Sequence, residues 1–253
     1  MRLADLTTTD AADALAVAEV AVLPTGSTEQ HGPALPLSTD AVSAEAVATG
    51  LDREDAVVLP TVPVGVSEHH RQFDGTLWLS EGTYEAVVRE ILAAIASHGV
   101  RKAVIVNGHG GNRAANTRAA HRLRNEEVAF VAPWSWFDGV PDELYDSLFD
   151  EGGGHADAGE SSVMLHLREG LVREDRLDDA QAGAPEDWGR EVAGAAVGFD
   201  TLDFSETGAT GKPTQANADA GQQLIEAGVE SLEELVDWLA ERPLEELWPK
   251  PHK

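Results

Sequence analysis

The stretch GSTEQHGPALPLSTD, residues 26–40, places two carboxylates and an imidazole close together among glycines and prolines. It follows an apolar run, residues 20–23, whose composition is typical of a buried strand. If the chain after this run is extended, Glu29 and His31 point to the same side, because side chains alternate along an extended backbone. Asp40 opens the next predicted helix, where it either caps backbone amides or reaches back towards that pair.

Two further polar clusters occur in the sequence. NGHGGN, residues 107–112, directly follows the apolar segment AVIV and contains His109. HADAGESS, residues 155–162, contains His155 and Glu160 on either side of small residues. Both clusters are therefore candidates for the same site as residues 26–40, provided that the fold brings them together.

The three clusters share two residue types, imidazole and carboxylate: His31, His109, His155, Glu29, Asp40 and Glu160. The chain has no cysteine, which excludes disulfides and thiolate metal sites. Imidazole and carboxylate ligands suit Zn²⁺, Mn²⁺ or Fe²⁺, and a two-metal site bridged by a carboxylate or hydroxide is feasible with this set. Such a site lowers the pKa of its water and polarises a carbonyl, so the clusters indicate hydrolytic chemistry.

Each cluster also has an ordinary structural interpretation. An isolated Asp in the context of Asp40 is more often a helix N-cap than a ligand. GHGG could form a tight turn, or a glycine loop that binds phosphate at a helix N-terminus, although it lacks the spacing of nucleotide-binding motifs. His155, next to three glycines, could be a loop residue. These alternatives weaken if all three clusters lie at the strand ends of one parallel sheet.

The other histidines and two tryptophans are not assigned to the site. Three histidines lie within helical patterns and are predicted to be surface or packing residues: His98, His121 and His166. The adjacent His69 and His70, in SEHHRQFDG, cannot easily both face one site. Trp134 and Trp136 fit the core and a pocket wall equally well.

Helices and strands alternate in the predicted pattern. Strands are predicted at 19–26, 56–65, 102–108 and 128–134. Helices are predicted at 10–18, 40–51, 80–100, 112–127, 161–171 and 220–243. The second helix has Asp40 or Thr39 as its expected N-cap, and Gly99 is the expected stop of the third.

This alternation favours an α/β fold with a mostly parallel sheet and helices on both faces. In such folds the ligand site lies at the carboxyl ends of the strands. The sequence has no internal repeat and no clear linker, so residues 1–253 are predicted to form a single domain.

The charge of the chain is strongly acidic, with a formal net value of −27. The acidic residues are scattered over surface-like segments, which favours a surface adapted to high salt, hence a halophilic protein. This charge argues against nucleic-acid binding, which needs a basic surface. No apolar stretch approaches the roughly 20 residues that span a bilayer, and the first residues lack the layout of a signal peptide, so we expect a cytoplasmic protein without membrane association.

Five stretches together resemble the creatininase (creatinine amidohydrolase) family. They are LPTGSTEQHGPALPLSTD, VPVGVSEHHRQFDGTLWLS, VNGHGGN, HADAGESS and GATGKPTQANADAG. The resemblance covers roughly residues 15–240. It implies a three-layer α/β/α fold, a dinuclear metal centre, hydrolysis of a C–N bond in a small amide, and usually a homo-oligomer, often a hexamer.

The resemblance also implies roles for the matching residues. Glu29 and His31 resemble terminal ligands on two different metals, Asp40 the bridging carboxylate, and His109 a further ligand. Glu160 matches a glutamate that serves as a further ligand or as an acid/base group. His155 matches a histidine of the family, and this resemblance implies that it orients the substrate or moves protons.

The second motif departs from creatininases proper, which have a tyrosine and a metal-binding glutamate where this chain has Gly110 and Gly111. A glycine has no side chain to donate, so Glu160 or water must serve instead. The glycine form also resembles archaeal deformylases that act on a formamidopyrimidine nucleotide, and the peptidase of the mycofactocin pathway.

The sequence therefore predicts a metal-dependent amidohydrolase with two divalent ions (Zn, Mn or Fe) and a small-molecule amide substrate. The alternatives are a creatininase proper, a mycofactocin-type peptidase, and a non-catalytic homologue that binds a metabolite at NGHGGN. Arg71, Arg113 and Lys212 are candidate phosphate contacts, although pairing with the abundant carboxylates explains them equally well.

Overall fold

The computed structural model describes residues 1–150, 154–186 and 188–251. Its main sheet has four strands in the order β2-β1-β3-β4, and all neighbouring pairs are parallel. The strands are β1 (Val20–Thr25), β2 (Ala56–Val58), β3 (Lys102–Asn107) and β4 (Phe130–Ser135). This arrangement confirms the predicted α/β class with a mostly parallel sheet.

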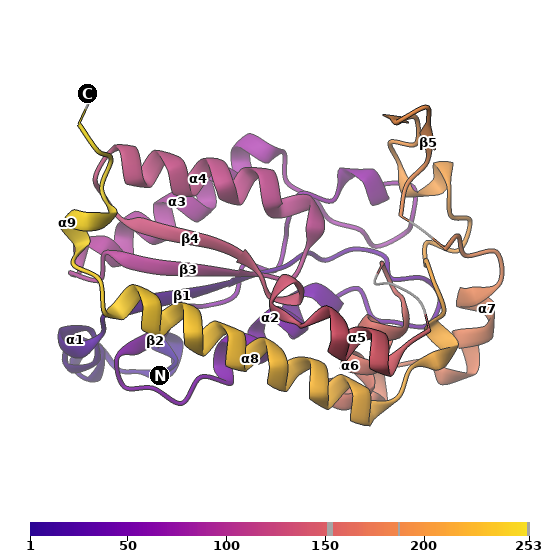
Figure 1. Ribbon diagram of the computed structural model, residues 1–253, viewed down its shortest axis with the longest axis horizontal. Coiled ribbons are helices and arrows are strands. Elements are labelled where there is room, and N and C mark those ends of the chain that lie inside the picture. The colour runs from indigo at the N-terminus through magenta and orange to yellow at the C-terminus, as the bar shows by residue number, and fades with distance from the viewer. Residues whose placement is uncertain (151–153, 187, 252–253) are drawn as a thin grey trace.

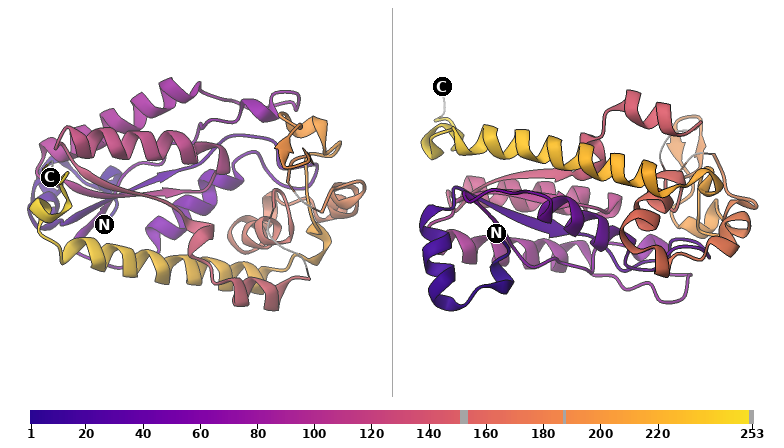
Figure 2. Two further views of the ribbon diagram at one scale, coloured as in Figure 1. Left: turned by 45° about the horizontal axis from the view of Figure 1, so that its top comes forward. Right: turned by 90° about the horizontal axis from the view of Figure 1, so that it is seen from below.

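Helices cover both faces of the sheet. They are α1 (Thr8–Val17), α2 (Thr39–Thr49), α3 (Glu81–Ser97), α4 (Arg113–Asn125), α6 (Ala158–Arg168) and α8 (Ala218–Ala240). The sheet lies between α8 on one side and α3 with α4 on the other (Figure 1, Figure 2). The three layers predicted from the family resemblance are therefore present.

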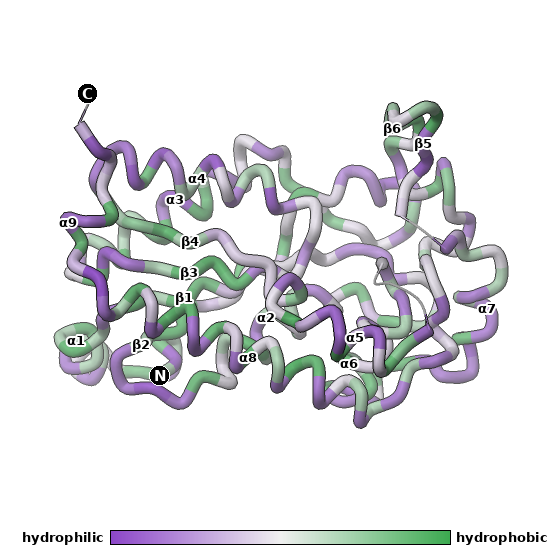
Figure 3. The backbone as a smooth tube through the Cα atoms, in the orientation of Figure 1, coloured by the Kyte–Doolittle hydropathy of each residue, from purple (hydrophilic) through white to green (hydrophobic). Residues whose placement is uncertain are grey.

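Alternation along the strands creates two apolar cores, one on each face of the sheet. Val20 and Val22 pack with α2 and α8, whereas Ala21 and Leu23 pack with α3 and α4. All four side chains are fully buried. Figure 3 shows the central strands as a hydrophobic band between helices with hydrophilic outer faces.

Strands β1, β3 and β4 end level with one another at their carboxyl ends. Thr25 pairs in register with Asn107, and Asn107 pairs with Ser135. The Asn107 side chain joins the three, because it accepts from Thr25 Oγ1 at 3.2 Å and donates to Ser135 Oγ at 3.1 Å. The segments that follow the three strands therefore leave the sheet at one edge.

Shorter elements gather beyond this edge, at the end of the molecule opposite α1 (Figure 1). They are α5 (Asp142–Leu148), α7 (Leu177–Gln181), and the hairpin of β5 (Glu191–Val192) and β6 (Ala195–Ala196). A last short helix, α9 (Leu244–Leu247), follows α8. None of α5, α7 and the hairpin was predicted from the sequence.

Two predicted element boundaries are wrong. The strand predicted over 56–65 ends at Val58, because Pro60 and Pro63 have no backbone N–H for a ladder. The helix predicted over 161–171 begins at Ala158, since the Asp157 side chain caps it by accepting from Glu160 N at 2.9 Å.

The predicted cap of α2 is also wrong. The helix begins at Thr39 after Ser38, which is the capping residue, and Asp40 lies in the first turn. The Asp40 carboxylate is directed towards two histidines instead. By contrast, α3 ends at Ser97, and Gly99 follows with a φ of 104°, as the predicted stop requires.

No helix within the described part of the chain is long and apolar enough to cross a bilayer. The assignment of residues 1–253 to one domain stays a prediction.

Candidate metal centre

The three polar clusters of the sequence meet at the carboxyl edge of the sheet. Glu29 and His31 lie in the segment after β1, Asp40 in the first turn of α2, and His109 directly after β3. Their side chains are almost completely buried, with exposures of 0% for Glu29 and His31, 2% for Asp40 and 4% for His109. Residues from separate segments thus form one buried centre.

Asp40 occupies the middle of this centre. Its Oδ1 atom lies 2.9 Å from His31 Nε2, and its Oδ2 atom lies 3.2 Å from His109 Nδ1. His109 Nδ1 is also 3.1 Å from Glu29 Oε1, and His31 Nε2 is 3.5 Å from Glu160 Oε2. The two oxygens of Asp40 therefore face two different histidines, as a bridging carboxylate would.

The outer nitrogens of both histidines contact backbone carbonyls. His109 Nε2 donates to Val66 O at 3.0 Å, and His31 Nδ1 donates to Glu29 O at 3.1 Å. Because a carbonyl only accepts, each outer nitrogen carries a proton, so the inner nitrogen is the one that offers a lone pair when the ring is neutral. Metal-binding histidines have this arrangement, with the second nitrogen held by a hydrogen bond.

Three carboxylate oxygens of the centre have no hydrogen-bond partner among the described residues: Glu29 Oε1, Glu29 Oε2 and Asp40 Oδ2. A buried carboxylate without a partner is strongly unfavourable unless a cation compensates it. The orphaned oxygens and the inward lone pairs together fit divalent metal ions.

The pKa values of the buried side chains also show that the centre favours positive charge beside its carboxylates. Burial disfavours the charged form of His31, but the facing carboxylates of Asp40 and Glu160 outweigh it and raise its pKa to about 10. Burial acts against charge on His109 too, yet Glu29 and Asp40 hold its pKa well above the usual value. Burial favours the neutral form of Glu29, but the opposing effect of His109 and His70 lowers its pKa.

Two glycines allow the segments to approach closely enough. A Cβ at Gly26 would overlap the backbone nitrogen of Ala41, and a Cβ at Gly108 would overlap the carbonyl oxygen of Asp40. The first turn of α2 therefore packs directly on the loops after β1 and β3. This contact is what brings Asp40 between the two histidines.

His155 and Glu160 flank the start of α6. Glu160 Oε2 accepts from Ala156 N at 2.6 Å, and a quarter of its side chain is exposed. Burial, opposed by His31 but supported by Asp40 and Asp157, raises the pKa of Glu160 to about 8. His155 is buried, and this burial lowers its pKa well below the usual value.

Sequence reasoning did not assign His70 to the centre. His70 ends the short helix η2 (Glu68–His70), is 1% exposed, and has Nε2 at 3.2 Å from Glu29 Oε1. Its neighbour His69 stacks on His109 with ring centroids 5.6 Å apart. His70 therefore contacts the centre directly, whereas His69 packs on His109 and lines the cavity.

A cavity of about 910 Å³ opens onto the centre. Glu29, Asp40, His109, His155 and Glu160 line its floor on the metal-ligand side. Its walls contain aromatic side chains: Trp136, Phe137, Tyr145, Trp188, Phe199 and Phe204. A substrate in this cavity would meet the candidate ligands, these aromatic side chains, and charged side chains that include Arg113, Asp142 and Asp146.

The structure also locates the histidines and tryptophans that were not assigned to the site from the sequence. The three histidines predicted to lie in helices at the surface are exposed: His98, His121 and His166. Trp136 is buried and lines the cavity, whereas Trp134 packs against the apolar core.

Two of the basic candidates, Arg71 and Arg113, form ion pairs with carboxylates. Arg71 pairs with Asp200 and Arg113 pairs with Asp138, each at 2.6 Å, which favours the alternative of surface ion pairs. Lys212 precedes the short helix η8 (Pro213–Gln215).

Comparison with known proteins identifies relatives of the chain. The family model of creatininase, described as creatinine amidohydrolase, matches residues 4–236. A mycofactocin precursor peptide peptidase of Mycobacterium tuberculosis is 34% identical over 222 residues, covering 83% of this chain and 81% of the relative. A creatinine amidohydrolase of Pseudomonas putida is 30% identical over 178 residues, covering 63% of this chain and 68% of the relative.

Solved structures show the same fold. A creatinine amidohydrolase (creatininase) crystal structure superposes with a TM-score of 0.80 at 24% identity, covering 96% of this chain and 98% of the other. Similar solved creatininases include a manganese form and a zinc–zinc form of a mutant. With the family model matching nearly the whole chain, the protein belongs to the creatininase family of amidohydrolases.

Proposed function

We propose that the protein is a metal-dependent amidohydrolase that cleaves a C–N bond of a small molecule with an activated water. The observation that carries this proposal is the buried pair Glu29 and Asp40, which face His31 and His109 and have three carboxylate oxygens without a hydrogen-bond partner among the described residues. A purely structural cluster would pair these oxygens, because an unpaired buried carboxylate is costly.

Two divalent ions would be held by the residues around Asp40, one by Glu29, Asp40 and His109, the other by His31, Asp40 and Glu160. Imidazole and carboxylate ligands suit Zn²⁺, Mn²⁺ or Fe²⁺. Bound ions of this kind polarise an amide carbonyl and lower the pKa of a coordinated water.

Glu160 is our candidate for the proton transfer. Its pKa is raised to about 8, chiefly by burial, so near neutral pH the carboxyl group exchanges a proton readily. Because Oε2 accepts from Ala156 N, we assign the transferred proton to Oε1. In this scheme Glu160 takes a proton from the attacking water and delivers it to the leaving nitrogen. The role of His155 in moving protons stays a prediction from the family resemblance.

The cavity supports a substrate larger than a single small ring. A volume of about 910 Å³ lies near the upper end of the roughly 300–1,000 Å³ usual for small-molecule sites. The aromatic walls favour a planar or apolar group attached to the scissile amide. A formamidopyrimidine nucleotide meets this description, and we place it first among the small-amide substrates.

A peptide substrate is the second candidate. It is supported by the 34% identity to a relative named as a mycofactocin precursor peptide peptidase, and by the same cavity of about 910 Å³. Creatinine itself is the third candidate, through the creatinine amidohydrolase relative.

The experiment that tests the function is a substrate panel assayed in about 2 M KCl, which screens the acidic surface. The metal-stripped protein is reloaded with Mn²⁺, Fe²⁺ or Zn²⁺ and offered a formamidopyrimidine nucleotide, short peptides and creatinine. Release of formate, of an amine, or of creatine identifies the substrate class. An Asp40→Asn variant is the control, and equal turnover by this variant would contradict the proposal.

We also propose an oligomeric state, a cellular location and a class of partners for the protein. We infer a homo-oligomer, often a hexamer in this family, in a halophilic cytoplasm, and no nucleic-acid or membrane partner. Light scattering in high salt measures the subunit number, and a monomer would contradict the inferred assembly.

A further inference from the structure

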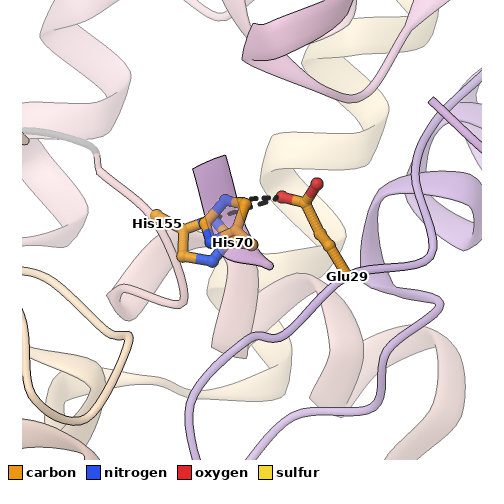
Figure 4. A group of neighbouring side chains, drawn as sticks. All are labelled: Glu29, His70 and His155. Carbon is orange, nitrogen blue, oxygen red and sulfur yellow. Dashed lines mark ion pairs between the residues drawn. The ribbon is translucent and has the colours of Figure 1, made fainter. Parts of the chain in front are cut away.

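Glu29, His70 and His155 converge from three segments of the chain, after β1, at the end of η2 and before α6. Figure 4 shows both imidazole rings directed at the Glu29 carboxylate. His70 Nε2 lies 3.2 Å from Glu29 Oε1, and His155 Nδ1 lies 3.8 Å from the same oxygen. We propose that these three residues form a further metal-binding position, distinct from the two that Asp40 would bridge.

The distances match a tetrahedral site. Zinc binds imidazole nitrogen and carboxylate oxygen at about 2.0–2.1 Å, which separates neighbouring ligand atoms by about 3.3–3.4 Å. The observed 3.2 and 3.8 Å bracket that separation. One ion therefore fits between the three side chains with only small side-chain movements.

The outer nitrogens of the two rings have acceptors. His155 Nε2 is 2.8 Å from the carbonyl oxygen of Gln30. His70 Nδ1 is 2.8 Å from Thr201 Oγ1, and the Thr201 hydroxyl can itself donate to His69 O at 3.1 Å. With protons on these outer nitrogens, both inner nitrogens present lone pairs to the centre, as metal-binding histidines do.

Because of Gln30, the tautomer of His70 should depend on whether an ion is bound. Gln30 Nε2 donates to Gly208 O and also lies 2.8 Å from His70 Nδ1 and 2.9 Å from His155 Nε2. Without an ion, His70 accepts from Gln30 and directs Nε2–H at Glu29. With an ion, His70 carries its proton on Nδ1 and donates to Thr201, at the cost of the Gln30 hydrogen bond. We therefore expect His70 to change its tautomer when a metal ion binds between Glu29, His70 and His155.

Glu29 supplies an independent reason for an ion at this position. It is 0% exposed, its Oε1 atom faces His70 and His109 nitrogens at 3.2 and 3.1 Å, and its Oε2 atom has no hydrogen-bond partner among the described residues. The same oxygen, Oε1, faces His70, His155 and His109, so Glu29 serves this position and the one near His109 together by turning Oε2 towards one of them. With two imidazoles and one carboxylate, the position suits Zn²⁺ better than Mn²⁺, which prefers oxygen ligands.

The test is the zinc stoichiometry of variants, measured by elemental analysis and chelator competition without substrate. His70→Phe keeps the ring volume and removes both nitrogens, and His121→Phe on the exposed face of α4 is the matched control. In an Asp40→Asn background we expect one tightly bound zinc that is lost when His70→Phe is added and kept when His121→Phe is added. Equal zinc content in all three proteins would overturn the proposal.

A second variant keeps the test decisive if His70→Phe does not fold. Thr201→Val preserves the shape of the side chain and removes the acceptor of His70 Nδ1. We expect this change to weaken the binding of one zinc by about 10- to 100-fold. Unchanged affinity would overturn the proposal.

Nuclear magnetic resonance of the ring nitrogens supplies a direct readout. Zinc should move the His70 proton from Nε2 to Nδ1, whereas a proton that stays on Nε2 would overturn the proposal. These measurements use no substrate, so they stand or fall separately from the proposed amide hydrolysis.

Discussion

Strand β1 and the segment that follows it are both buried, but they differ in whether their side chains have partners within the protein. Along β1, Val20 to Leu23 are fully buried among other apolar side chains. A few residues later, Glu29 and His31 are equally buried, but their neighbours are charged or titratable groups. The first region is complete without a ligand, whereas the second has carboxylate oxygens with no hydrogen-bond partner among the described residues.

The difference shows what each region contributes. Burying apolar surface stabilises a fold by roughly 25 cal/mol per Å². Burying an ion costs several kcal/mol unless a partner compensates it. The apolar cores therefore stabilise the sheet and hold its edge in position, and that stability allows the edge to retain a centre that is unfavourable until cations bind.

The largest expected effect comes from a substitution at Asp40, which should impair the centre and leave the apolar cores intact. Asp40→Asn keeps the size of the side chain but removes the charge between His31 and His109. We expect turnover to fall by about a thousandfold or more, because the metal ions are lost or misplaced. Turnover and metal content of the variant, with circular dichroism as the control for folding, measure this effect.

Glu160→Gln should have the next largest effect. The amide cannot exchange a proton, so we expect turnover to fall by about a hundredfold or more. The metal content should fall much less than in Asp40→Asn, since Glu29, His31, Asp40 and His109 remain. A variant that turns over at the normal rate would remove Glu160 from the proposed proton transfer.

Leu92→Ala tests the apolar side of the comparison. Leu92 on α3 is fully buried against the sheet, so its truncation should cost about 2–5 kcal/mol of the free energy of unfolding. The folded fraction should keep its normal metal content and turnover. Leu171→Ala, at a side chain that is 52% exposed, is the control and should change stability by less than about 0.5 kcal/mol.

Proton release on metal binding gives a smaller effect. Near pH 7.5 the metal-free protein carries a proton on His31, because its pKa is raised to about 10. A ligand histidine must be neutral, so metal uptake releases that proton and the apparent affinity should rise by about tenfold per pH unit. Calorimetry in buffers of different ionisation enthalpy measures the release, and an affinity independent of pH between about 6.5 and 8.5 would contradict this account.

Salt should produce the smallest of these effects. With a net charge of −27, screening by KCl reduces repulsion across the whole surface. We expect the melting temperature to rise by several degrees or more between about 0.1 and 2 M KCl. A melting temperature that falls with KCl would contradict the halophilic interpretation.

The sequence predicted the regions whose signals are local. Short apolar runs predicted the strands, and motif residues immediately after them, such as His109, predicted the position of the centre. Asp40 was ambiguous, because capping a helix and facing a metal require the same residue at the same helix end. Only the packing of α2 on Gly26 and Gly108 decides between these roles.

The missed residues depend on contacts between distant segments. His70 reaches Glu29 because the strand before it stops early and η2 redirects the chain. Its outer nitrogen meets Thr201, which is 131 residues away in the sequence. No local pattern carries such information. The hairpin of β5 and β6 is local, and it was missed because each of its strands has only two residues, all exposed, and so gives no apolar pattern.

The most direct test of the account is the metal dependence of turnover. Once a substrate from the panel is identified, the protein is stripped with a strong chelator in high salt, and its metal content and turnover are measured together. We expect turnover to disappear with the metal and to return when Zn²⁺, Mn²⁺ or Fe²⁺ is added back. Full turnover by protein that retains no metal would contradict the assignment of Glu29, His31, Asp40 and His109 as a metal centre.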